Sequence, residues 1–166
     1  MDGIHNKSSS LEEQYDKIYR YCYYKLQQRE TAEDITQETF LRYLNHYRYQ
    51  SVSQAMPYLY TIARNLCIDE YRRQKPLPFY PHMEEELAEK TGADDRMLSA
   101  LSMKMALAKL EEEEREMILL RYVNEVPLAV ISQMFGFSRF AVYRKLSKAL
   151  KKLEEMLEGE DYKSAK

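Results

Sequence analysis

The stretch that decides the fold of this chain is PLAVISQMFGFSRFAVYRKLSKALKKL, residues 127–153. Pro127 suits the first turn of a helix and Gly136 suits the end of one, so the start of the stretch predicts a short helix. Ser138 predicts the N-cap of a longer helix, which we expect to reach about Leu157. A short helix, a turn containing Gly and a longer basic helix form a helix-turn-helix motif.

The longer helix of this motif has an apolar side and a basic side. Its apolar residues, at helical spacing, are Val142, Leu146, Ala149, Leu150 and Leu153. No acidic residue occurs in 126–153, whereas its second half contains Arg139, Arg144, Lys145, Lys148, Lys151 and Lys152. Such basic side chains bind DNA phosphates, and residues near the start of the helix reach base edges. We therefore predict DNA binding; the alternative is a solvated charged face, which usually mixes both signs of charge. The residues expected to face outward are Arg139, Phe140, Tyr143, Arg144, Ser147 and Lys148.

Composition favours a globular, helical chain. Of its 166 residues, 45% are hydrophobic and 31% charged, only 4 are Gly and 5 are Pro, and the formal net charge is −2. Three prolines within residues 75–81, followed by an acidic stretch, predict a flexible linker over 75–94. The predicted fold class is all-α, with two small helical domains over residues 10–74 and 95–157. Residues 1–9 and 158–166 are expected to be disordered ends.

Three amphipathic helices are predicted in the first domain. The first, about 11–28, is capped by Ser10 with Glu13, and the second, about 32–48, by Thr31 with Asp34. The third is expected to open at Pro57 and to reach about Arg73. Their core-facing residues are predicted to be Tyr15, Ile18, Tyr19, Cys22 and Leu26; Phe40, Tyr43, Leu44 and Tyr47; and Leu59, Ile62, Ala63 and Leu66. The two cysteines, Cys22 and Cys67, are expected to be buried free thiols in a reducing cytoplasm.

Two further helices are predicted ahead of the helix-turn-helix. One runs from about Asp95 to Lys109, and Glu111–Glu114 place four carboxylates at the positive end of the next. The residues expected to face the core are Met97, Leu101, Met105 and Leu110 in the first of these helices, and Met117, Ile118, Leu120 and Tyr122 in the second.

Two more surfaces are candidates for binding. The side of helix 32–48 opposite its apolar face has an acidic, polar stripe that ends in a Leu: Asp34, Gln37, Glu38 and Leu41. In 57–75, the residues off the core face are Arg64, Asn65, Asp69, Arg72 and Arg73, and ring surfaces come from Tyr58, Tyr60 and Tyr71. Basic groups interleaved with aromatic rings suit single-stranded nucleic acid. From the residues alone, other interpretations remain open. The acidic stripe could be ordinary solvent surface, the tyrosines could belong to the core, and the arginines could cap the C-terminal end of the helix.

Three segments in this order resemble one protein family. AEDITQETFLRYL (32–44) resembles the core-polymerase-binding segment of bacterial sigma factors. PYLYTIARNLCIDEYRRQK (57–75) resembles the promoter-melting segment of the extracytoplasmic-function group of the sigma-70 family. LEEEEREMILLRYVNEVPLAVISQMFGFSRFAVYRKLSKALKKL (110–153) resembles the second conserved domain of that group. The resemblance implies a transcription initiation factor that directs core RNA polymerase to promoters and assists strand opening.

The resemblance also implies a role for each surface. The polar face of helix 32–48 would dock on the clamp helices of the largest polymerase subunit, through Asp34, Gln37, Glu38 and Leu41. The −10 element would be read by Tyr49, Gln50, Ser51, Ser53 and Gln54, and the separated strand held by Asn65, Arg72 and Arg73. The −35 element would be bound by Ser138, Arg139, Phe140, Tyr143, Arg144, Lys145 and Lys148. Further implied partners are the polymerase flap and promoter DNA, and an anti-sigma factor is left open.

The sequence departs from the family's usual pattern at a few of these positions. The family usually has Trp where Tyr58 stands, a small residue and Thr where Phe140 and Ala141 stand, and Lys or a similar residue where Tyr143 stands. Tyr58 can still pack or stack as a Trp would, whereas Phe140 and Tyr143 concern which −35 sequence is read and leave the fold expectation unchanged.

The sequence gives little support to other classes of function. The three His residues are scattered, and no Ser/His/Asp set, metal-ligand spacing or phosphate-binding Gly loop occurs, so we expect no enzyme, cofactor or small-molecule substrate. With no signal-peptide core and no apolar run of about 18 residues, we expect a cytoplasmic protein without membrane insertion. Two alternatives stay open: a helix-turn-helix regulator that recruits no polymerase, and a module that occupies polymerase without promoter specificity.

Overall fold

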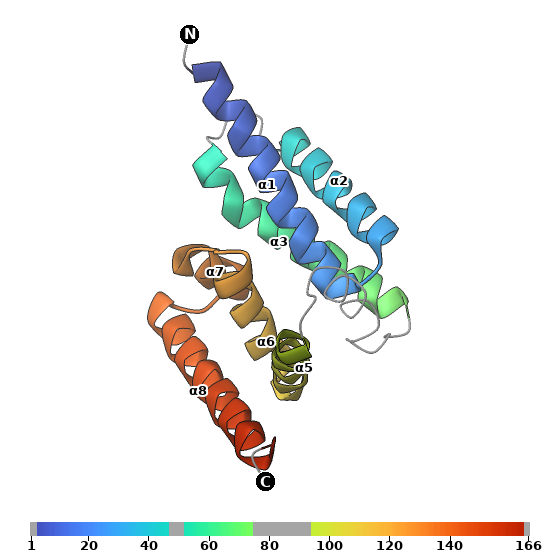
Figure 1. The fold of residues 1–166 in the computed structure, drawn as a ribbon. Coiled ribbons are helices and arrows are strands. Elements are labelled where there is room, and N and C mark those ends of the chain that lie inside the picture. Colours follow the sequence, from blue (N-terminus) through green and yellow to red (C-terminus); the bar gives the residue numbers. More distant parts are fainter. Residues whose placement is uncertain (1–2, 47–51, 75–93, 165–166) are drawn as a thin grey trace. The chain divides into compact units, whose positions relative to one another are not determined.

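The computed structural model describes residues 3–46, 52–74 and 94–164, and all regular elements among them are helices (Figure 1). They are α1 (Gly3–Leu26), α2 (Arg29–His46), α3 (Val52–Arg73), α5 (Asp94–Lys109), α6 (Glu112–Ile118), the π-helical turn η1 (Leu119–Val123), α7 (Leu128–Phe135) and α8 (Arg139–Ser164). The all-α prediction is confirmed. None of these helices is long and apolar enough to cross a membrane.

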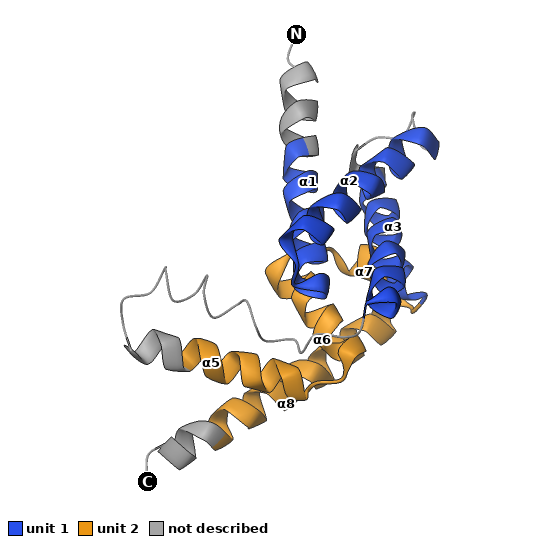
Figure 2. Ribbon diagram, turned by 90° about the vertical axis from the view of Figure 1, so that its right-hand side faces the viewer, with its two compact units in different colours: residues 1–77, 133–136 blue, residues 78–132, 137–166 orange. Residues whose placement is uncertain are grey.

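The chain divides into two compact units, coloured separately in Figure 2. Residues 1–77 with 133–136 form the first unit, and residues 78–132 with 137–166 form the second. This division agrees with the predicted two-domain chain. The linker expected over 75–94 lies outside the described residues, except for its last residue, Asp94, which begins α5.

Helices α1, α2 and α3 each contact the other two and enclose the core of the first unit. Ile18, Cys22, Ala63 and Cys67 are fully buried, and both cysteines are free thiols, as expected. Aromatic contacts join the helices: the rings of Tyr21 and Tyr60 meet edge to face at 5.7 Å, and Tyr15 contacts Phe40 at 5.3 Å. Buried Thr36 and Thr39 satisfy their hydroxyls by donating to carbonyls one turn earlier in α2, those of Ala32 and Ile35.

The helices of this unit start earlier than their predicted caps. α1 begins at Gly3, so residues 3–9 belong to a helix rather than to the disordered end expected for 1–9, and Ser10 lies inside the helix instead of capping it. Thr31 lies inside α2, where its hydroxyl donates to Oε1 of Gln28 at 3.0 Å. α3 begins five residues before Pro57, because a Pro there removes only one backbone hydrogen bond and the turn before it buries Ala55. The polar connection predicted before Pro57 is therefore helical from Val52 onward.

The second unit is built on α8, which contacts both α5 and α6. Its core includes Met117, Leu120, Ile131, Val142 and Ala149, all fully buried or nearly so. Glu111 caps α6 through a capping box with Glu114, so the predicted acidic helix start is confirmed. The helix predicted to end near Leu157 continues to Ser164, so 158–164, expected outside any helix, belong to α8.

Three predicted core positions of this unit are wrong. Leu101 and Met105 are 43% and 47% exposed, because α5 has apolar residues on every side and buries Lys104 and Ala106 instead. Tyr122 is 53% exposed because it lies in η1, where the wider π-helical turn breaks the 3.6-residue spacing used to predict it. In the first unit Leu44, in the last turn of α2, is likewise exposed, at 47%.

Candidate nucleic-acid interface

The turn between α7 and α8 is built by Gly136 and its neighbours. Gly136 adopts φ +70°, a left-handed conformation that ends α7 as the sequence predicted. The Phe137 N–H donates to the Ser132 carbonyl at 3.2 Å, and the Ser132 hydroxyl donates back to the Phe137 carbonyl. Ser138 then caps α8, because its Oγ accepts the Ala141 N–H at 3.1 Å. These local bonds fix where α8 starts and which of its faces points outward.

The outward face of α8 carries the residues that the sequence placed there. Val142, Leu146, Ala149 and Leu153 are buried, whereas Arg139, Arg144, Ser147 and Lys148 are exposed. Phe140 and Tyr143 are exposed by 68% and 58%, so both rings are surface groups rather than core. Two large exposed rings beside three cations are unusual for a solvated face and suit contact with a nucleic acid.

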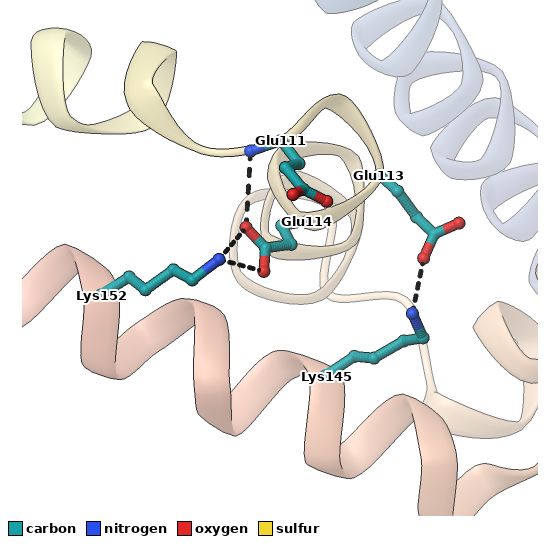
Figure 3. Close-up of polar contacts among 5 residues, drawn as sticks. All are labelled: Glu111, Glu113, Glu114, Lys145 and Lys152. Carbon is teal, nitrogen blue, oxygen red and sulfur yellow. Dashed lines mark hydrogen bonds and ion pairs between the residues drawn. The ribbon is translucent and has the colours of Figure 1, made fainter.

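The basic residues of α8 are not equivalent (Figure 3). Lys145 Nζ pairs with Glu113 Oε1 at 2.9 Å and lies 4.7 Å from the ring centroid of Phe137. Lys152 Nζ pairs with both carboxylate oxygens of Glu114, at 2.7 and 2.9 Å. Lys145, which the resemblance assigns to DNA contact, has its ammonium paired with a carboxylate of α6 in this structure. Nothing in the sequence signalled these pairs, because the acids were interpreted only as a favourable helix start.

On α2, the acidic stripe predicted from the sequence lies on the surface. Asp34 and Gln37 are exposed, and Leu41 is exposed by 57%. Glu38 Oε1 accepts a hydrogen bond from Arg42 Nε at 2.6 Å, within the same helix. The stripe thus presents the exposed carboxylate of Asp34, the carboxylate of Glu38 already paired with Arg42, and the exposed side chain of Leu41.

On α3, only part of the predicted surface is available. Asn65, Arg72 and Arg73 are exposed, and Arg73 pairs with Glu70 at 2.7 Å. Tyr60 is fully buried against Tyr21, so its predicted role as a ring surface is wrong, whereas Tyr58 and Tyr71 are 40% and 45% exposed. Of the predicted −10 residues, Tyr49, Gln50 and Ser51 lie outside the described residues. Ser53 and Gln54 belong to the first turn of α3 rather than to a connection.

Comparison with known proteins decides the family. Sigma-70 region 2 matches residues 11–76, and Sigma-70, region 4 matches residues 100–153. The RNA polymerase sigma factor CarQ of Myxococcus xanthus is 30% identical over 129 residues, which cover 76% of this chain and 74% of that protein. The chain belongs to the sigma-70 family. Region 2 falls on α1–α3 and region 4 on α5–α8.

This sigma factor is of the extracytoplasmic-function type. The ECF RNA polymerase sigma factor SigW of Bacillus subtilis is 29% identical over 159 residues, which cover 86% of this chain and 83% of SigW. The sigma factor RpoE of Bartonella quintana, solved with the anti-sigma factor NepR, matches the fold with a TM-score of 0.63 at 18% identity, over 93% of this chain and 97% of RpoE. A sigma factor binds core RNA polymerase and directs promoter-specific initiation. The alternative, a DNA-binding regulator that recruits no polymerase, has no support in these comparisons.

Proposed function

We propose that this sigma factor uses its two units for separate tasks at the promoter. The first unit docks on core polymerase and holds the −10 region, and the second reads the −35 element through the start of α8. The observation that carries this proposal is the first turns of α8, where Ser138 fixes the helix start and Arg139, Phe140 and Arg144 are exposed. The factor itself catalyses no reaction in this proposal and acts in the cytoplasm, where promoter DNA lies.

Docking on polymerase is assigned to the exposed stripe of α2. Asp34 and Glu38 would pair with arginines on the clamp helices of the largest subunit, and Leu41 would bury its exposed side chain between them. Gln37 would add a neutral hydrogen-bonding group. Since Arg42 already holds Glu38, docking exchanges an internal ion pair for an intermolecular one, and Asp34 is expected to contribute more.

The melted strand is assigned to the last turns of α3. Asn65 and Arg72 are exposed there, and the half-exposed rings of Tyr58 and Tyr71 are available for stacking. Tyr49–Gln54 would contact the −10 element ahead of that strand. The polymerase flap and a regulator of the anti-sigma class remain proposed partners.

The deciding experiment adds the purified chain to core polymerase and maps transcript starts on a genomic promoter library. Starts that share −10 and −35 sequence elements support the proposal. Polymerase binding without specific starts would mean that the chain occupies polymerase but does not read promoters. The promoter fragments selected in this way are the DNA probes for the experiments below.

A further inference from the structure

The six basic residues over 139–152 of α8 divide into two sets: Lys145 and Lys152 form a flanking set, and the other four, Arg139, Arg144, Lys148 and Lys151, form an outward set. Lys145 and Lys152 are seven residues apart, or two turns, so they share one flank of the helix. On that flank lies the first turn of α6, and both ammonium groups reach its carboxylates (Figure 3). Arg144, Lys148 and Lys151 point to the outward face and are exposed. Before DNA binds, the flanking set is therefore already paired with carboxylates of α6, whereas the outward set faces solvent.

The acidic turn is itself held in place. The Glu111 N–H donates to Glu114 Oε2 at 3.4 Å, which completes the capping box and orients the Glu114 carboxylate. The Glu114 side chain is only 13% exposed, whereas that of its partner Lys152 is 34% exposed. The Glu113–Lys145 pair is more open, with side-chain exposures of 42% and 43%. The Glu114–Lys152 pair is thus the more strongly ordered of the two.

The electrostatics of Glu114 agree with a persistent pair. Partial burial alone would raise the pKa of Glu114, but the hydrogen bond and charge of Lys152, the Glu111 N–H and the charge of Lys148 together lower it. The same hydrogen bond from Glu114 raises the pKa of Lys152. Both groups are therefore charged over the whole neutral range.

We propose that Glu113 and Glu114 are positioning residues of the DNA-binding helix, which withhold Lys145 and Lys152 from DNA phosphates and so favour promoter over non-specific binding. The inference rests on the proposed DNA contact of α8. Non-specific affinity comes almost entirely from lysines and arginines that neutralise phosphates, each steepening the salt dependence by about 0.9 in log K against log salt. A lysine held by a carboxylate adds nothing to that slope. The two pairs thereby limit sequence-independent binding while leaving Arg139 and Arg144 to read bases.

The test measures the salt dependence of DNA binding by holoenzyme assembled with the full chain and its variants. The probes are a selected promoter fragment and a duplex of random sequence. Lys152→Met removes the paired charge, and Lys148→Met, four residues away on the exposed face, is the matched control. We expect Lys148→Met to reduce the slope by about 0.9 and Lys152→Met to leave it unchanged. Thermal unfolding and core binding of each variant confirm that it is folded and assembled.

Glu114→Gln supplies the converse measurement. It releases Lys152, so we expect the slope on random DNA to steepen by about 0.9 and the ratio of promoter to random-sequence affinity to fall. The double variant Glu114→Gln/Lys152→Met should return the slope to that of the parent, which loss of structure alone would not do. Glu113→Gln should act in the same direction through Lys145.

Two results would overturn the inference while leaving the proposed function intact. A drop in slope for Lys152→Met equal to that for Lys148→Met would mean that the pair opens on DNA. An unchanged slope for Glu114→Gln would mean that Lys152 is not withheld. If Lys148→Met and Arg144→Ala both leave DNA binding unaltered, the DNA contact of α8 is wrong, and the inference falls with it.

Discussion

The guanidinium carbon of Arg144 lies 5.0 Å from the ring centroid of Phe140, one turn earlier in α8. A cation over an aromatic face is attracted by the ring and loses some of its conformational freedom. The Phe140 ring therefore orients Arg144 while Phe140 itself stays 68% exposed. If α8 enters the major groove as proposed, we expect Arg144 to contact a guanine and Phe140 a thymine methyl group.

Phe140→Ala should leave the stability within about 0.5 kcal/mol of the parent, because the ring is exposed. It should abolish discrimination between thymine and uracil at one −35 position of a selected promoter. Thermal unfolding and binding to singly uracil-substituted fragments measure the two effects. A variant that retains both full stability and full discrimination would rule out base reading by Phe140.

Arg144→Ala should cost roughly 1–3 kcal/mol in promoter binding and relax preference at a single −35 position. Phe140→Leu keeps an apolar side chain but removes the ring, so it should reproduce part of the Arg144→Ala loss if the ring orients the guanidinium. Binding to a set of promoter fragments with every −35 substitution checks this. Loss spread evenly over all sequences would indicate that Arg144 only meets phosphate.

Asp34→Lys with Glu38→Lys should abolish binding to core polymerase through charge reversal on the α2 stripe, while the fold is retained because neither side chain is buried. The matched control is Glu12→Lys with Asp16→Lys, which reverses two exposed acids at the same spacing on α1. Affinity for core polymerase is measured by fluorescence titration. Equal loss in both double variants would point to bulk charge rather than docking.

Arg72→Ala should weaken promoter opening more than Arg73→Ala, because Arg73 must first give up its ion pair with Glu70. Permanganate footprinting of a weak promoter reports melted thymines, and gel shifts of the closed complex report earlier binding. If both variants melt DNA as well as the parent, the arginines only cap the end of α3.

The Glu114–Lys152 pair should make stability fall in acid. Because the pKa of folded Glu114 is below its ordinary value of 4.5, the pair stabilises the fold above that value and is lost as pH falls through the folded pKa. The difference in unfolding free energy between the parent and Glu114→Gln should therefore shrink below about pH 4.5. Chemical denaturation across pH measures it, and a difference that does not change with pH would argue against a persistent pair.

Much of the fold could be predicted from local chemistry, whereas contacts between residues far apart in the sequence could not. Gly136 and Ser138 act on backbone within a few residues, so the turn and the start of α8 could be predicted from neighbouring residue types. The pair of Glu113 with Lys145 joins residues 32 positions apart, and no sequence pattern encodes that distance. The helix start predicted at Pro57 and the core position predicted for Tyr122 were wrong for another reason. Rules for ideal helices do not anticipate a Pro tolerated inside α3 or the π-helical turn η1.

Polymerase-docking and DNA-reading residues were predicted by resemblance, and the structure adds which of them are accessible. Asp34, Leu41 and Arg72 are exposed where the resemblance needs them. Tyr60 could not be distinguished from its neighbours by spacing, because α3 carries tyrosines on more than one side.

The chain has only 2 cysteines, both fully buried within the α1–α3 core, and none in the second unit. A thiol reagent can therefore modify the protein only when that core opens. The labelling rate under native conditions reports the opening free energy of the polymerase-binding unit by itself, without any introduced probe. Repeating the measurement with core polymerase present would give the stabilisation that docking confers on this unit alone.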